Sequence, residues 1–528
     1  MATRLTPFSR LLIVVGILAG IVFGGKYLIE NSSLGNKIKS DDPKVEKVEQ
    51  GKTLPIDDDV LNVQIFTFGN AAPGLYFNNG TEPNENSRFY KDYGLKVKFH
   101  VIDDFDASRQ AFKGDKVQLF NNETSAMATE MQGLASFDPQ VVMQIDWSRG
   151  ADAVVAKRGI TSINDLKGKK VAVAPSTPSQ TLLLFMLEAA NLKTTDIQMV
   201  EVPTTADAET AFKSGKVDAA VVWDAQASLR EVPGSKVLQS TVTASNIIAD
   251  VFMGKKAWVN ANKDKLRKFY DGWMKAVAEI NSDPAAKDKA AALMAANLQL
   301  SKNDALGMID ALRLTNHGDN INYFGLNPDY KGITGEALYI KMGDKFQALG
   351  FAPANRPNWR ALSNSYAVFW RALSNSYAVS NSELNNTGIN AGEGNAKFTP
   401  ATAAQKSAPA MATKTISITF PTGSYALGEN AKSLIDIQFA DVAKGFGNAR
   451  VRIEGNTDNV GNKLKNVELS RKRAEAVASY LEKTYNMDSN RFIIIGNGQD
   501  KPVPGCESNS TPECKAKNRR TEFQLIGE

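Results

Sequence analysis

Hydrophobic and polar positions alternate regularly along most of this chain from residue 60 onward. Short apolar runs predict strands at 63–68, 95–102, 171–174, 197–202 and 219–223. Among the later runs, the apolar positions follow a helical period at 179–190 and 206–214, and further helices are predicted at 262–316 and 331–349. Strands that alternate with helices predict doubly wound, parallel α/β sheets.

An eleven-residue sequence is duplicated. WRALSNSYAVF at 359–369 recurs almost unchanged as WRALSNSYAVS at 370–380. Two copies are too few to form a solenoid. On a helix, an eleven-residue step returns nearly to the same face, which would place Trp359 over Trp370. We therefore expect a local duplication that extends one helix, and we assign no chemistry to it.

Two polar segments divide the chain. Residues 31–55 are highly charged, and residues 381–413 are rich in Asn, Gly, Ala, Ser and Thr without periodicity, so both are predicted to be linkers. A chain of 528 residues is long enough for two or three domains. We expect a membrane segment at 1–30, a linker at 31–55, a large domain at 56–355, the repeat with a flexible linker at 356–413, and a small domain at 414–528.

The N-terminus carries a hydrophobic segment preceded by positive charge. Arg4 and Arg10 come before an uncharged run at 11–25, and with Lys26 snorkelling the stretch 11–29 approaches the ~20 residues that span a bilayer. Positive charge before the span predicts that the rest of the chain is exported. A cleaved signal peptide is the alternative, but without an A-x-A cleavage pattern the sequence favours one uncleaved transmembrane helix in the inner membrane.

Gly16, Gly20 and Gly24 would fall on one face of this helix and let a second helix approach closely. The pattern indicates a homo-oligomer or a membrane partner, although small residues are equally common in export signals. The segment holds no Asp or Glu, which argues against a proton-conducting stator subunit of the MotB kind.

Composition favours binding over catalysis. The chain is 43% hydrophobic and 23% charged, and its net charge of +5 includes no basic block that would indicate nucleic acid binding. The only histidines, His100 and His317, are expected at the surface or in a strand rather than as catalytic bases. HExxH, Walker A and GxGxxG motifs are absent from the sequence. We therefore predict no enzyme activity, no cofactor and no metal.

The two cysteines, Cys506 and Cys514, flank the polar loop sequence CESNSTPEC. This spacing suits a disulfide in an oxidising compartment. A metal site is the weaker alternative, because the sequence offers no other Cys and no nearby His as a further ligand.

A carboxylate and a guanidinium are closely spaced in the last hundred residues. The sequence GNTDNVGNKLKNVELSRKR at 455–473 places Asp458 in a Gly/Asn turn and Arg473 in the first turns of a predicted helix. A fixed carboxylate can take the ammonium of an amino acid, and a fixed guanidinium can take its α-carboxylate as a forked pair. The alternative is a structural ion pair at a loop–helix junction.

Residues 415–526 resemble the C-terminal peptidoglycan-binding domain of the OmpA family. The resemblance rests on the opening ITFPTGSYAL at 418–427, the G-x-T-D turn, the helix with Arg473-Ala474, and the closing Asn518-Arg519-Arg520. It implies a small α+β domain in which Asp458 and Arg473 hold the diaminopimelate of the peptide stem and Asn466 supports the loop. Some members also carry a cysteine pair in this loop. One departure is Asn456, which stands where the family commonly has His.

Residues 60–355 resemble the periplasmic solute-binding proteins of the NitT/TauT type. The motifs are DLKGKKVAV at 165–173, SGKVDAAVVWD at 214–224 and FYKDYGLKVKF at 89–99. The resemblance implies a two-lobed periplasmic-binding-protein fold that closes on a ligand at its hinge, as in uptake of nitrate, sulfonates, bicarbonate or thiamine precursors.

A ligand in such a fold lies where strand ends meet helix N-termini of both lobes. Hydroxyls and amides crowd two such positions, although a single hydroxyl would suffice for ordinary helix capping. A small oxyanion is the first choice of solute and an amine-bearing or peptidoglycan-derived solute the second, while Asp224 would meet a cation or the hinge. The candidate contacts are Asn70, Asn122, Thr124, Ser125, Ser176, Thr177, Ser179 and Asp224.

These patterns predict a periplasmic solute-binding protein of a Gram-negative bacterium, anchored in the inner membrane and tethered to peptidoglycan by its last domain. Its expected partners are the diaminopimelate stem, a small solute and the membrane, with no nucleic acid. The alternative is a scaffold component of an envelope complex, a tether of the MotB kind, in which the solute-binding fold no longer serves transport.

Overall fold

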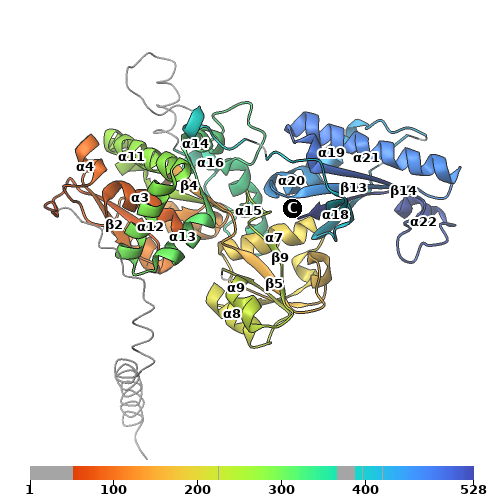
Figure 1. The fold of residues 1–528 in the computed structure, drawn as a ribbon, viewed down its shortest axis with the longest axis horizontal. Helices are drawn as coiled ribbons and strands as arrows, with labels where there is room; N and C mark the ends of the chain where they lie inside the picture. The colour runs from red at the N-terminus through yellow and green to blue at the C-terminus, as the bar shows by residue number, and fades with distance from the viewer. Residues whose placement is uncertain are drawn as a thin grey trace, which may run out of the picture.

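The computed structural model describes residues 52–223, 225–364, 387–394, 396–418, 420–421 and 423–527. They form two α/β lobes and a smaller C-terminal domain, and Figure 1 shows them side by side. The predicted membrane helix with its three glycines, the second copy of the repeat and Asp224 lie outside these residues. None of the helices within the described ranges combines the length and hydropathy needed to cross a bilayer.

The first lobe is built on a six-stranded sheet. Its strands, in spatial order, are β11 (Leu312–Leu314), β4 (Pro139–Ser148), β10 (Ala249–Lys255), β3 (Leu119–Glu123), β1 (Leu61–Ile65) and β2 (Val97–Val101). Its helices are α3 (Ala72–Asn78), α4 (Arg88–Tyr93), α5 (Phe105–Lys113), α6 (Met127–Leu134), α10 (Lys256–Ala261), α11 (Lys263–Ser282), α12 (Pro284–Leu298), α13 (Lys302–Asp310) and α14 (His317–Tyr323).

The second lobe is built on a five-stranded sheet. Its strands, in spatial order, are β7 (Gln198–Glu201), β6 (Lys170–Val173), β8 (Ala219–Val222), β5 (Ala153–Ala156) and β9 (Lys236–Ser240). Its helices are α7 (Pro178–Ala189), α8 (Thr205–Lys213) and α9 (Ala225–Glu231), and the later helices α15 (Gly335–Ala348) and α16 (Trp359–Leu362) return along the molecule. The chain passes between the lobes twice, at 149–152 and at 241–248, and these two crossovers form the hinge.

The prediction of parallel sheets is only partly correct. β1 pairs in parallel with β2 and β3, and β6 pairs in parallel with β7 and β8, but β10 and β5 run antiparallel to their neighbours. β11 also runs antiparallel to its neighbour β4, whereas β5 and β10 each follow a crossover. The chain enters each sheet from the hinge side there, which reverses the strand direction.

The duplicated sequence does not continue one helix, so that prediction is wrong for the first copy. α16 ends at Leu362, and Ser363 is extended with φ −81° and ψ 125°. Ser363 instead forms a bridge with Val141, and the Asn364 N–H donates to the Val141 carbonyl at 2.8 Å. Pairing with a buried strand of the first lobe therefore outweighs helical extension at this point.

The C-terminal domain packs helices on one mixed sheet. Its strands, in spatial order, are β12 (Ala412–Ile416), β15 (Thr521–Ile526), β13 (Arg450–Asn456) and β14 (Phe492–Gly498). Its helices are α18 (Ala403–Ser407), α19 (Glu429–Ile435), α20 (Asp441–Gly445), α21 (Lys463–Tyr485) and α22 (Pro512–Asn518). A disulfide joins Cys506 and Cys514, whose Cα atoms lie 5.1 Å apart.

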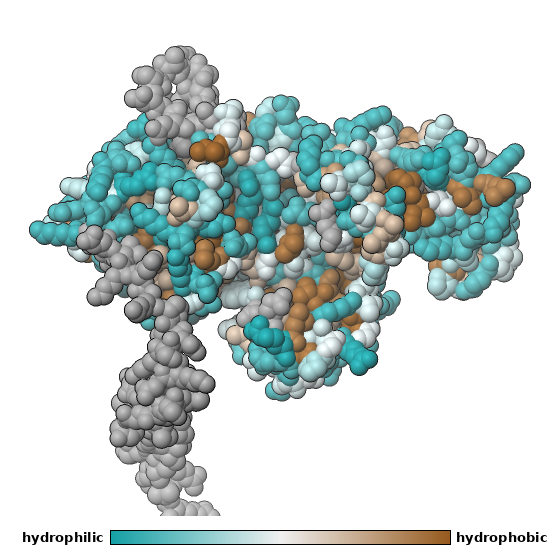
Figure 2. Space-filling view, viewed as in Figure 1, coloured by the Kyte–Doolittle hydropathy of each residue, from teal (hydrophilic) through white to brown (hydrophobic). Residues whose placement is uncertain are grey.

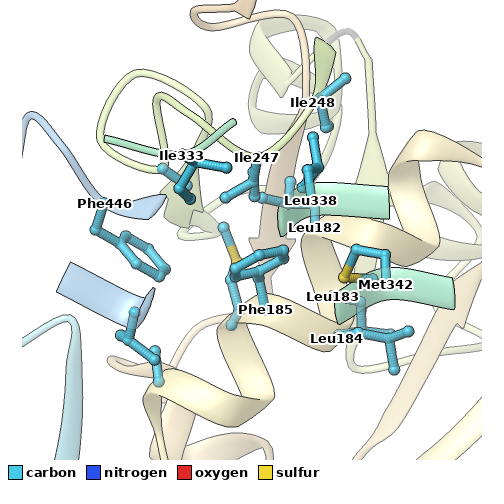
Figure 3. Packing of buried hydrophobic residues seen from close by; sticks show 14 of the residues in the cluster. Leu182, Leu183, Leu184, Phe185, Ile247, Ile248, Ile333, Leu338, Met342 and Phe446 are labelled. Carbon is cyan, nitrogen blue, oxygen red and sulfur yellow. The ribbon is translucent and has the colours of Figure 1, made fainter. Parts of the chain in front are cut away.

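The C-terminal domain shares a hydrophobic core with the lobes. Figure 3 shows Phe446 facing Phe185 of α7, with Ile247 of the second crossover beside them and Leu338 of α15 close by. All four side chains are buried. Figure 2 shows that hydrophilic residues cover most of one face of the molecule, with hydrophobic residues in separate groups. The three units are thus held together by apolar burial, which is the main favourable contribution to folding.

Residues 387–394, which lie within the predicted flexible linker, pack against α14. The Asn316 side-chain amide donates to the backbone carbonyls of Ile389 and Ala391 at 3.1 and 2.7 Å. Gly318 approaches Gly392 so closely that a Cβ on Gly318 would lie 2.0 Å from the Gly392 nitrogen. Small residues without periodicity predicted flexibility, but here they allow two backbones to meet.

Candidate functional site

A pocket of about 370 Å³ opens on the C-terminal domain between the strands β13 and β15 and the end of α22. Of the arginines that line it, Arg473 belongs to α21 and Arg519 follows α22. The remaining lining residues are Ser417, Ile418, Phe420, Gly455, Asn456, Ala516, Lys517, Arg520 and Thr521.

Asp458 lies in the turn after β13 and faces Arg519. The Arg519 Nη1 donates to the Asp458 Oδ2 at 2.6 Å, and the Asp458 side chain is 14% exposed. The Val460 N–H donates to Asp458 Oδ1 at 3.1 Å. The Asn466 side-chain amide donates to the carbonyls of Asp458 and Val460, which closes the turn onto the first residues of α21.

Arg473 lies half-buried on the other side. Its Nε donates to the Ser424 carbonyl at 3.0 Å, and its guanidinium lies 4.9 Å from the centre of the Phe420 ring. Burial lowers the pKa of Arg473, the nearby Arg519 lowers it further, and Asp458 opposes that shift. A guanidinium has five N–H donors, so these contacts leave N–H groups of Arg473 available for a ligand.

The structure places Asp458 close enough to Arg473 to affect its pKa, but it does not pair the two side chains. Among the described residues, Asp458 pairs with Arg519 rather than with Arg473. Sequence reasoning did not assign Arg519 a role, although the Asn-Arg-Arg sequence at 518–520 was part of the resemblance. Arg519 is 61 positions from Asp458 along the chain, so only the Asn-Arg-Arg motif could have indicated it as the partner of Asp458.

Asn456, at the position where the resembling family commonly has His, is buried in the turn. Its backbone N–H donates to the Arg520 carbonyl at 2.9 Å, and its side-chain oxygen accepts from Asn497 at 3.1 Å. Asn497 also donates to Glu454, which pairs with Lys501. This polar network fixes the end of β13, from which the turn with Asp458 begins.

In the first lobe, the start of α6 is occupied by a carboxylate of the chain itself. Glu123, at the end of β3, accepts hydrogen bonds from the N–H groups of Ser125 and Ala126, both at 2.8 Å, and of Ala249 at 3.1 Å. Its other close donor is the Ser125 hydroxyl at 2.6 Å. Burial raises the pKa of Glu123 to about 8, although the Ser125 hydrogen bonds act to lower it.

The other contacts predicted in the first lobe are also used within the protein. Asn122 accepts from Arg109 at 3.0 Å. The hydroxyls of Thr124 and Tyr323 are hydrogen bonded at 2.7 Å. The hydroxyl of Ser125 is hydrogen bonded, at 2.7 Å, to Thr181 of the second lobe, so the two helix starts meet directly.

The residues predicted as ligand contacts in the second lobe differ in exposure and in their hydrogen-bond partners. Ser176 and Thr177 are partly exposed at the start of α7, and Ser176 adopts a left-handed backbone with φ 59°. The Thr177 hydroxyl donates to the Ala174 carbonyl at 2.8 Å. Ser179 is buried with its hydroxyl 3.3 Å from that of Thr205, so it faces α8.

Acidic side chains gather where the lobes join. Asp146 of β4 and Asp250 of β10 are cross-strand neighbours whose carboxyl groups share a hydrogen bond. The Asn70 side-chain amide donates to Asp250 Oδ2 at 2.7 Å. On the first crossover, Asp152 accepts from the Trp223 indole at 3.0 Å and from Ser148 at 2.9 Å. Burial raises the pKa of each of these three carboxyls.

The histidines show no catalytic arrangement within the described residues. His317 is buried in the first turn of α14, not at the surface or in a strand as expected, and its Nδ1 lies 2.8 Å from the Tyr270 hydroxyl. Burial lowers its pKa to about 4. His100 lies in β2 and contacts the Asn62 side chain at 2.8 Å.

Two family models match separate parts of the chain. The model described as NMT1/THI5 like matches residues 85–287, and the model of the OmpA family matches residues 419–519. Neither match indicates a catalytic family. Domains of these two kinds imply a periplasmic or envelope location.

Curated relatives match in the same two regions. The peptidoglycan-binding protein ArfA of Mycobacterium tuberculosis (strain ATCC 25618 / H37Rv) is 39% identical over 107 residues, 19% of this chain and 32% of that protein. Outer membrane protein A of Bordetella avium is 35% identical over 101 residues, 19% of this chain and 50% of that protein. An aliphatic sulfonates-binding protein of Escherichia coli (strain K12) is 36% identical over 103 residues, 20% of this chain and 32% of that protein. The chain thus spans about a third to a half of the length of these relatives.

Two solved structures that align with part of this chain are named for the solutes they bind. The aliphatic sulphonate binding protein SsuA from Escherichia coli is 20% identical and covers 58% of this chain, 92% of its own length, with a TM-score of 0.46. The nitrate-binding protein NrtA from Synechocystis PCC 6803 is 11% identical and covers 61% of this chain, 89% of its own length, with a TM-score of 0.45. On the two family matches, residues 85–287 belong to an NMT1/THI5-like domain and residues 419–519 to a domain of the OmpA family.

Proposed function

We propose that this protein is a periplasmic solute-binding protein whose C-terminal domain binds peptidoglycan and so tethers the protein to the cell wall. The observation that carries the proposal is one pocket of about 370 Å³ that is lined by Arg473 and Arg519, with Asp458 paired to Arg519 at 2.6 Å. One carboxylate and two guanidiniums suit a diaminopimelate residue, which carries both an ammonium and a carboxylate. ArfA, a relative of this domain, is named for binding peptidoglycan.

In the proposed complex, Asp458 accepts the ligand ammonium and Arg473 takes the ligand carboxylate as a forked pair. Arg519 then has two roles. It neutralises Asp458 before binding, and it adds a second cation to the carboxylate end of the pocket. Asn466 holds the turn backbone, so its contribution is to position Asp458 rather than to touch the ligand.

Sedimentation with purified peptidoglycan sacculi tests this proposal. We expect Asp458→Ala and Arg473→Ala each to weaken binding by about 2–5 kcal/mol, because each leaves the opposite charge of the ligand unpaired. Arg471→Ala is the matched control, since Arg471 is exposed on the same helix and pairs with Glu468 and Glu475. If both pocket variants pellet with sacculi as the parent does, the assignment of the site is wrong.

The N-terminal segment is proposed to anchor the chain in the inner membrane. The support is its apolar run with positive charge before it. Alkaline carbonate extraction of cell membranes, followed by mass determination of the N-terminus, tests it. An anchored, uncleaved chain stays in the pellet, whereas a soluble chain that begins after residue 30 would refute the anchor.

The solute-binding role is proposed for the region between the lobes. Its support is the match to the NMT1/THI5-like family and the gathering of polar residues at strand ends. A solute that binds the folded state raises the melting temperature by mass action. Thermal shifts with a panel of small anions, amines and amino acids measure this, and a panel without any shift would count against the role.

A scaffold function is the second candidate, and one observation favours it. Asn122, Thr124 and Ser125 are satisfied by other groups of the chain, and the Ser125–Thr181 contact holds the lobes together. A receptor whose lobes never separate would serve as a rigid spacer between membrane and wall. The thermal-shift panel separates the two functions, because a spacer gives no solute-dependent shift.

A further inference from the structure

Asp250 presents a carboxyl to the region between the lobes. It stands at the beginning of β10, next to the second crossover, and it is partly exposed, whereas Asp146 beside it is 1% exposed. Asn70 follows directly after β1 and contacts Asp250 through its side-chain nitrogen at 2.7 Å. These three side chains thus come together at the strand ends of the first lobe, where ligands of such sheets bind.

Two buried oxygens at this place have no donor. Among the described residues, neither Asp146 Oδ2 nor Asn70 Oδ1 accepts a hydrogen bond from an N–H or hydroxyl group. Both side chains are at least 98% buried. Buried polar atoms are normally paired, so an unpaired oxygen in a folded protein indicates an unseen partner. The missing partner is a donor, either protons on the carboxyls or a group of a ligand.

The charge of the surroundings favours a positive ligand. Glu123 and Asp152 lie close enough to raise the pKa of neighbouring carboxyls. Within the described part of the chain, Glu123, Asp146, Asp152 and Asp250 form no ion pair with Lys or Arg. The N–H groups at the start of α6, which would receive an oxyanion, already bind Glu123. An anion placed beside Asp250 would meet carboxyl groups, and the start of α6 is already taken by Glu123.

We propose, on the basis of the solute-binding role, that the site between the lobes takes a primary ammonium held by Asp250, Asp146 and Asn70. An ammonium has three N–H donors, which we assign to a carboxylate oxygen of Asp250, Asp146 Oδ2 and Asn70 Oδ1, and the proton that the two carboxyls share leaves when the ammonium binds. Trp223, 52% exposed at the end of β8, adds an aromatic ring on the facing lobe. The solute is then an organic amine, and the oxyanion that we expected first is disfavoured.

Calorimetric titration of the full chain with two probes of similar size tests this inference. Propylamine carries the proposed ammonium, and propane-1-sulfonate carries the oxyanion. We expect propylamine to bind and propane-1-sulfonate not to bind. Asp250→Asn should weaken propylamine binding at least tenfold, while Asp57→Asn, an exposed acid near the N-terminal end of the domain, should leave it unchanged.

A second measurement keeps the inference testable if Asp250→Asn fails to fold. Because the free carboxyls hold protons, binding of an ammonium to the parent should release protons, and its affinity should rise between pH 6 and 8. Propylamine binding with no pH dependence, or with full affinity in Asp250→Asn, overturns the assignment. Binding of propane-1-sulfonate in place of propylamine overturns the ammonium assignment but leaves the solute-binding role intact. If neither probe binds and no compound of the thermal-shift panel shifts the melting temperature, the solute-binding role is refuted as well.

A separate set of contacts involves the hinge itself. Arg149 of the first crossover donates to Glu393 of the linker segment at 2.5 Å and to Asn246 of the second crossover at 3.0 Å. The Asn246 N–H donates to the Gly445 carbonyl at the end of α20 at 3.1 Å. Both crossovers are therefore bonded to the chain that carries the wall-binding domain.

We infer independently that the C-terminal module restrains lobe closure. Hinge closure rotates two lobes about a few residues that absorb the change in backbone dihedrals. Here those residues are fixed from outside by the linker segment 387–394 and by α20.

Distance measurement by electron resonance between spin labels tests this restraint. The labels are placed by Lys116→Cys in the first lobe and Lys216→Cys in the second, both exposed. We expect a narrow interlobe distribution that widens in Gly318→Ala and, to a smaller extent, in Glu393→Gln, with Glu429→Gln as the exposed control. An unchanged distribution in Glu393→Gln and in folded Gly318→Ala refutes the restraint.

Discussion

Replacing Glu123 by Gln should change how stability depends on pH. Burial raises the pKa of Glu123 from 4.5 to about 8 in the folded protein. Between these values the folded state holds a proton that the unfolded state has released, so the free energy of unfolding falls as pH rises. The neutral amide of Gln has the same shape and no such titration.

The useful window lies above pH 6.5. Below it His317, whose pKa burial lowers to about 4, acts in the opposite direction, because the unfolded chain binds a proton that the folded histidine does not. From pH 6.5 to 8, one proton held only by the folded state lowers the free energy of unfolding by about 2 kcal/mol, at about 1.36 kcal/mol per pH unit. Asp146, with its pKa raised to about 7, adds a smaller decrease in the same direction.

Urea unfolding of the full chain at pH 6.5, 7, 7.5 and 8, followed by tryptophan fluorescence, measures the effect. The parent should lose about 2 kcal/mol or more across this window, and Glu123→Gln should lose about 2 kcal/mol less than the parent. Glu85→Gln replaces an exposed acid of the same lobe and should follow the parent. Parallel pH profiles for the parent and Glu123→Gln would show that the Glu123 carboxyl is already ionised when folded.

Three further predictions concern the C-terminal domain. Replacing Cys506 and Cys514 by Ser should lower its stability by about 2.5 kcal/mol in denaturant unfolding, because the disulfide closes a short loop in the unfolded chain; equal midpoints with and without reductant would contradict this. Arg491→Met should cost about 3 kcal/mol or more by the same assay, since the buried guanidinium donates to three backbone carbonyls that would lose their partner. Phe446→Ala should cost about 3–5 kcal/mol by opening a cavity in the shared core, and differential scanning calorimetry should then show the C-terminal domain melting separately from the lobes.

Local patterns identified several of the elements and the two domain families, but they missed strands such as β4 and β10, and β11 lies inside a range predicted to be helical. The runs at 171–174 and 179–190 became β6 and α7 with small shifts at their ends. Periodicity reports which face of an element is buried, and that depends on neighbours within a few residues. The same reasoning failed at Ser363, where a distant strand supplied a better hydrogen-bond partner than the next helical turn.

By itself, the sequence predicted a shared site for Asp458 and Arg473, and it did so through the motifs that resemble the OmpA family, because spacing alone left a structural ion pair open. It did not determine their partners. Arg519 reaches Asp458 from 61 residues away, and the Ala249 N–H reaches Glu123 from 126 residues away. Tertiary structure decided these pairs, and with them the acidic character of the site between the lobes, because a charged group takes the nearest compatible partner in space and chain separation does not limit that choice.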